Sequence, residues 1–142
     1  MQHDELIGKV QALAQLPDRG SAERTTRAVL ATLAERIPPG LAHHLAAQLS
    51  PGLADAITAT VPEPESTGAD PGHAERFDLT VFAGRVAARV GTTEEAAVQQ
   101  STSVLEVLDA AVTPEVMEKV ATALPADIRE LLPSSRADDS GT

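Results

Sequence analysis

The sequence contains no cysteine, no tryptophan and no tyrosine, and its only aromatic residues are Phe77 and Phe82. Without cysteine the chain forms neither a disulfide framework nor a thiolate metal site. No apolar run approaches the roughly 20 residues of a membrane-spanning helix. The opening stretch MQHDELIGK also lacks the basic-then-apolar pattern of a secretory signal. We therefore expect a soluble, cytoplasmic protein.

Positive charge is scarce as well. There are 11 Lys and Arg against 21 Asp and Glu, which gives a net charge of -10. Residues 62–75 carry several of the acids and no Lys or Arg. Phosphate contacts supply most of the non-specific affinity for nucleic acid, and aromatic side chains supply the stacking. Because this chain has little of either, we expect no nucleic-acid binding, and we expect no membrane insertion.

What the sequence does have is a large apolar fraction, 42%, made mostly of Ala, Leu and Val. These residues recur at helical spacing and do not alternate with polar residues over any long run. Ala22, Val29, Leu30 and Leu33, for example, fall at i, i+7, i+8 and i+11. This spacing predicts an all-α fold with amphipathic helices.

The chain also repeats itself. Residues 22–57 align without a gap with residues 97–132, and the matched apolar positions are those expected on the core face of a helix. They include the pairs Val29/Val104, Leu30/Leu105, Leu33/Leu108, Ala46/Ala121 and Leu49/Leu124. Self-similarity of this kind predicts an internal duplication.

Each repeat is predicted to form four helices. The predicted helices are 3–15, 22–36, one from Pro39 and one from Pro51, then 79–90, 93–111, one from Pro114 and 126–132. We expect tandem duplicated four-helix repeats, about eight helices, packed with pseudo-two-fold symmetry. The predicted domains are repeat one over 1–61, a flexible acidic Pro/Gly linker over 62–75, repeat two over 76–132 and a disordered tail over 133–142.

Capping residues mark several of the expected helix ends. Gly91 is expected to end a helix, and Thr92 has capping-box spacing with Glu95. The other expected N-caps are Ser21, Ser50, Asp78 and Thr113.

The second half contains an aromatic that opens its first helix, a V-L-x-x-L core in its second and a Leu-Pro pair before its last. These elements are Phe82, Val104-Leu105-Leu108 and Leu124-Pro125. On these residues the chain resembles, over nearly its whole length, the bacterial family catalogued as domain of unknown function 2267. The first half departs from the pattern, with Leu6 in place of the aromatic and LSPGL in place of the LPxxL-type ending. Because the motif is structural, the resemblance implies an all-α fold and transfers no catalytic residues.

No residue pattern predicts catalysis. His43 and His44 are adjacent, so on a helix they point about 100° apart and do not easily hold one metal ion. Glu94 and Glu95 suit the first turn of a helix, where acids complement the helix dipole. The serines lack a G-x-S-x-G elbow. We expect surface histidines, no catalytic or metal site and no cofactor.

The two halves differ at four positions that are apolar in the second half and small, polar or charged in the first. Val98, Val107, Met117 and Leu131 stand where the first half has Glu23, Thr32, Ala42 and Ala56. Two interpretations are open. Either repeat one covers these side chains, or they form an exposed groove for a partner helix or a second copy of the chain.

These observations favour a non-enzymatic helical module that acts through protein–protein contacts, with self-association as one form of such contact. The alternative is a small-molecule or lipid-binding regulator with an apolar pocket between the repeats.

Overall fold

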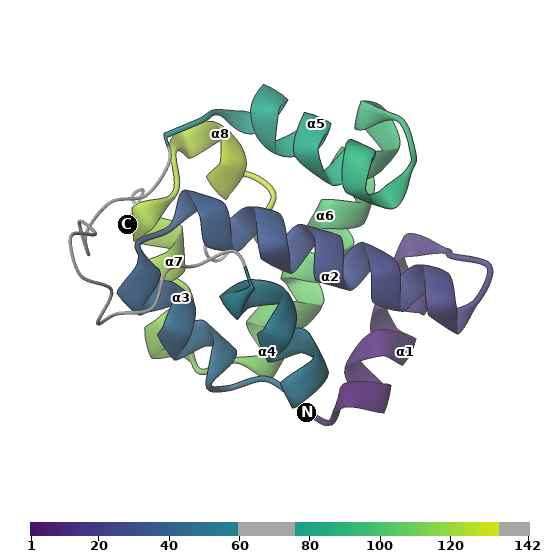
Figure 1. Cartoon of the computed structure of the whole chain (residues 1–142), viewed down its shortest axis with the longest axis horizontal. Helices are drawn as coiled ribbons and strands as arrows, with labels where there is room; N and C mark the ends of the chain where they lie inside the picture. The colour runs from purple at the N-terminus through teal and green to yellow at the C-terminus, as the bar shows by residue number, and fades with distance from the viewer. Residues whose placement is uncertain (60–75, 134–142) are drawn as a thin grey trace.

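The structure is a computed structural model that describes residues 1–59 and 76–133. Within these residues the chain forms α-helices and no strand, so the predicted all-α fold is confirmed (Figure 1). The predicted linker, and all of the predicted tail except Pro133, lie outside the described residues. The helices are α1 (His3–Ala14), α2 (Arg19–Arg36), α3 (Pro39–Ala46), α4 (Pro51–Thr58), α5 (Leu79–Val90), α6 (Glu94–Ala111), α7 (Pro114–Ala123) and α8 (Ala126–Arg129).

The two long helices, α2 and α6, organise the packing. In Figure 1, α2 crosses the middle of the molecule, with α5 above it and α4 below it. α1 packs on α2 and also on α6, while α5 packs on α6 and also on α2. α2 contacts α6 as well, and α3 contacts α7. Helices from the first and second halves of the chain therefore share one core.

The apolar faces that the sequence spacing identified are the faces that the fold buries. Val29, Leu30 and Leu33 on α2 are buried, as are Val104 and the other matched residues of α6. Five further matched pairs are buried in both halves: Ala22 with Ala97, Ile37 with Val112, Leu45 with Val120, Ala46 with Ala121 and Leu53 with Ile128. In the pair Leu49/Leu124, Leu124 is buried and Leu49 is partly buried. The predicted core faces of both long helices are confirmed.

α3, α4 and α7 begin at the predicted prolines, and two of the expected capping residues are also found as predicted. The Asp78 carboxylate accepts a hydrogen bond from the backbone N–H of Val81 at 3.1 Å and caps α5. The same helix ends at Gly91, whose φ of 86° lies in the left-handed region that favours glycine.

Other expected ends are wrong by a few residues. α2 begins at Arg19 because Asp18, and not Ser21, is its N-cap. The backbone N–H of Ser21 donates to the Asp18 carboxylate at 2.7 Å, which holds the pKa of Asp18 below its ordinary value. α6 is capped by Thr93, whose hydroxyl oxygen accepts from the Ala96 N–H at 3.1 Å, so the capping box from Thr92 does not form.

The predicted caps at Ser50 and Thr113 stand at N-cap positions, but neither side chain caps its helix. The Ser50 Oγ lies 2.8 Å from Nδ1 of His3 instead, and this contact joins the start of α4 to the start of α1. The last helix is shorter than predicted and ends at Arg129, because Leu131 and Leu132 follow as a turn with buried side chains.

A charged cluster also joins α2 to α5. One oxygen of the Glu35 carboxylate lies 2.9 Å from a guanidinium nitrogen of Arg85, and the other lies 2.7 Å from one of Arg89. Arg89 donates a further hydrogen bond of 2.7 Å to the Thr32 hydroxyl. The Arg85 guanidinium also stacks 4.3 Å above the ring of Phe77. Thr32 stands where the second half has Val107. Its buried hydroxyl therefore links α2 to α5.

Leu30→Ala and Leu105→Ala should each lower the free energy of unfolding by about 2–5 kcal/mol, because each removes most of a fully buried leucine side chain. Leu13, which is 48% exposed, provides the control, and Leu13→Ala should cost no more than about 0.5 kcal/mol. Urea unfolding followed by circular dichroism measures all three. If Leu30→Ala or Leu105→Ala lowers the free energy of unfolding no more than Leu13→Ala does, the assignment of that leucine to the core is wrong.

Glu35→Gln should lower the free energy of unfolding by about 1–3 kcal/mol, because two partly buried guanidinium groups lose a charged acceptor. The Glu35 side chain is 14% exposed. Glu5→Gln is the control, since Glu5 pairs with Lys9 at 3.9 Å on an exposed surface and should cost at most about 0.5 kcal/mol. Equal losses in the two variants would show that the cluster stabilises no more than a surface pair.

Candidate functional site

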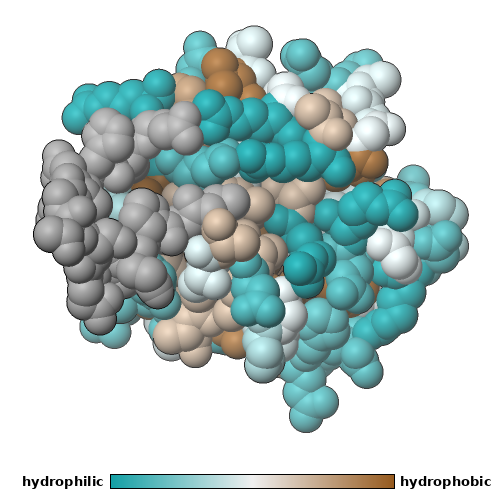
Figure 2. All heavy atoms as spheres, in the orientation of Figure 1, coloured by the Kyte–Doolittle hydropathy of each residue, from teal (hydrophilic) through white to brown (hydrophobic). Residues whose placement is uncertain are grey.

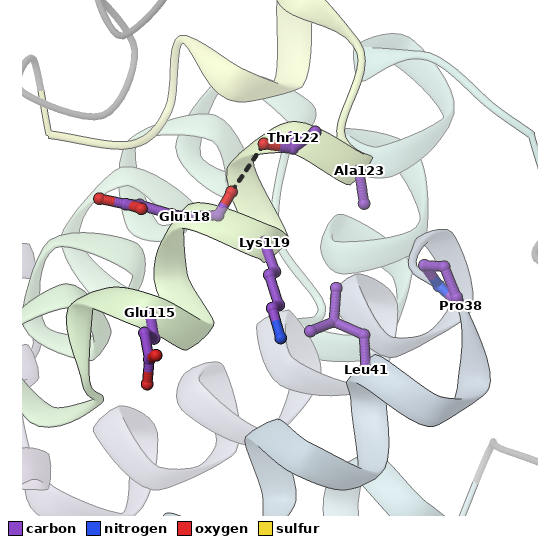
Figure 3. Close-up of a pocket in the computed structure, with 7 residues that line it drawn as sticks. All are labelled: Pro38, Leu41, Glu115, Glu118, Lys119, Thr122 and Ala123. Atoms are coloured by element: carbon purple, nitrogen blue, oxygen red, sulfur yellow. Dashed lines mark hydrogen bonds between the residues drawn. The ribbon is translucent and has the colours of Figure 1, made fainter.

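A groove lies between α3 and α7, with a cavity volume of about 440 Å³ (Figure 3). Figure 3 shows Leu41 pointing from α3 toward α7, and Lys119 extending from α7 toward Leu41. The groove is open to solvent on one side. Its lining residues are Pro38, Leu41, Glu115, Glu118, Lys119, Thr122 and Ala123.

The sequence builds the groove from two short amphipathic helices. Ala42 and Leu45 of α3, and Met117 and Val120 of α7, are buried in the shared core. The residue before Ala42 is Leu41, which is only partly buried and packs at the edge of that core. The shared core therefore holds both helices in place. The groove lies between the two helices, at the edge where their buried faces end.

A polar clasp between Gln48 and Thr113 fixes the start of α7 relative to the end of α3. The Gln48 side-chain oxygen accepts from the backbone N–H of Thr113 at 2.9 Å. The Gln48 side-chain nitrogen donates to the Thr113 hydroxyl oxygen at 3.2 Å. Because the two residues are 65 positions apart in sequence, this pair ties together distant parts of the chain.

The groove combines apolar walls at one end with charged side chains along one edge. Its walls at one end are the ring of Pro38, the side chain of Leu41 and the methyl group of Ala123. Glu115, Glu118 and Lys119 are exposed along the α7 edge. The Thr122 hydroxyl donates to the backbone oxygen of Glu118 at 2.9 Å, as the dashed line in Figure 3 marks.

A second hollow, of about 140 Å³, lies between the end of α1 and α6. Its lining is more polar and includes Gln15, Gln99, Gln100 and Ser103. The side-chain oxygen of Gln100 is buried and has no hydrogen-bond partner within the described chain. A hollow of this size and polarity fits ordered water better than an organic ligand.

The lining of the α3–α7 groove includes none of the four positions that are apolar in the second half and small, polar or charged in the first: Val98, Val107, Met117 and Leu131. Val107, Met117 and Leu131 are buried, with 3%, 0% and 5% of their surfaces exposed. Val98 is partly buried and packs against the core. Among the described residues, the large exposed apolar side chains are Met1, Leu13 and Val81.

The histidines occupy three different environments. His44 is exposed, and His43 is partly buried and has an interaction partner. His3 lies between Ser50 at 2.8 Å and a carboxylate oxygen of Glu23 at 3.8 Å. A serine nucleophile needs a base held by a third group within hydrogen-bond reach, and 3.8 Å exceeds that reach. We therefore interpret the His3 contact as a link between helices.

The described residues contain no group of three or more His, Asp or Glu side chains that could hold a metal ion. Within the same residues, no helix combines the length and the apolar character needed to cross a membrane.

Val107→Asp should lower the free energy of unfolding by about 3–5 kcal/mol, because it places a carboxylate without a partner at a site that is 3% exposed. Val81 is 40% exposed in the first turn of α5, so Val81→Asp is the matched control and should change stability by no more than about 0.5 kcal/mol. Thermal unfolding and sedimentation of both variants measure stability and association state. A stable Val107→Asp protein with altered association would overturn the burial of Val107 and restore the exposed-face interpretation.

The fold and the groove together define a small all-α domain with an open seam between two of its helices. The chain belongs to the family of uncharacterized conserved proteins DUF2267, whose model matches residues 3–131. That span includes all the described helices, and it confirms the resemblance inferred from Phe82, the V-L-x-x-L core and the Leu-Pro pair. A search of the curated proteins found no match to the chain.

Proposed function

We propose that this chain is a non-enzymatic helical module that acts through protein contacts, and that the α3–α7 groove is its docking surface. The observation that supports this most is the form of the groove, which has apolar walls at one end and charged side chains along one edge. Amphipathic helices bind other proteins in this way, with apolar anchors in a groove and charges at its edges.

The openness of the groove favours a protein segment as the occupant. Small-molecule sites usually enclose most of the ligand surface, because the ligand has no other way to bury its apolar atoms. A groove that is open along one side leaves one face of its occupant in water. A helical segment of another protein tolerates this, since it has a polar face of its own.

An apolar or lipid-like small molecule remains the alternative occupant. The volume of about 440 Å³ supports it, because ligand sites commonly measure about 300–1,000 Å³.

We also propose that the domain is an internally duplicated pair of four-helix repeats related by a pseudo-two-fold axis. Two features support this. α1 and α5 both have 12 residues, and α2 and α6 both have 18. The packing is also reciprocal, since α1 lies on α6 and α5 lies on α2. On this proposal α3 and α7 are equivalent helices, and the groove lies where they meet.

The alignment of the repeats then suggests why the groove is open. Ala123 aligns with Gln48, and Pro38 aligns with Thr113. Gln48 and Thr113 form the clasp, whereas Ala123 and Pro38 line the groove. Alanine has no side chain that could reach across, and proline has neither the N–H nor the hydroxyl that Thr113 offers. On this proposal the contact between α3 and α7 is bridged by Gln48 and Thr113 on one side of the axis, and it is open at Ala123 and Pro38 on the other.

The docking function is tested by filling the groove. Ala123→Arg places a long side chain in it, and Ala110→Arg places the same side chain at an exposed position of α6. Proteins captured from cell lysate by the wild type and by Ala110→Arg should be lost with Ala123→Arg, as measured by mass spectrometry of the captured proteins. Circular dichroism checks that both variants stay folded.

Identical protein lists from all three chains would contradict the groove as the docking surface. Native mass spectrometry of the purified chains tests the alternative occupant. A small apolar molecule that copurifies with the wild type and with Ala110→Arg, but not with Ala123→Arg, would favour the ligand-binding function instead.

A further inference from the structure

We draw no further inference here: the strongest candidate, the apolar end of the α3–α7 groove between Pro38, Leu41 and Ala123, belongs to the site already described, and within residues 1–59 and 76–133 nothing shows what occupies it.

Discussion

Burial of the apolar faces of α2 and α6 is the interaction on which the rest of the structure depends. A set of four short helices is only marginally stable on its own, because a unit of that size buries only about 60% of the surface that its unfolded chain exposes. In this chain each long helix packs against the other, against the helix before it and against the first helix of the other half. α3 and α7 meet beside this shared core, where the hydrogen bonds between Gln48 and Thr113 add to their contact.

The fold could be predicted from the sequence because its main signals are local. The spacing of Leu30, Leu33, Leu105 and Leu108 marks one face of each long helix, and that face is the one that becomes buried. The start of α2 was less visible. Residues 19–21 are Arg, Gly and Ser, which carry no apolar periodicity. The spacing of apolar residues therefore could not reveal the helical turn that follows Asp18. At the start of α6 two adjacent threonines can each cap a helix, and only the backbone geometry selects Thr93 over Thr92.

The candidate site was not visible in the same way, because it depends on residues that meet only in three dimensions. Leu41 has the spacing of an ordinary apolar helix residue, and nothing near it in sequence shows that it lies at the open end of a seam. For Val107 and Met117 the sequence left two interpretations open, cover by repeat one or an exposed groove, and both side chains are buried in the structure. The Glu35 cluster was missed for a related reason, since its carboxylate and its two guanidinium partners are about fifty positions apart. Charge spacing within one helix carries no information about such pairs.

The clasp between Gln48 and Thr113 has a consequence for how such a domain can change over evolutionary time. A single-copy structure that loses a bridging side chain also loses the contact that the side chain made. In a duplicated structure the contact exists twice in principle, so one copy can keep two helices in register while the other is trimmed. On the proposed duplication, Gln48 belongs to the copy of this contact that holds α3 and α7 together, and Ala123 belongs to the copy that leaves room between them. A new binding surface can thus arise when one copy of the contact loses its bridging side chain. The residues around the lost bridge can then diversify toward different partners while the other copy preserves the fold.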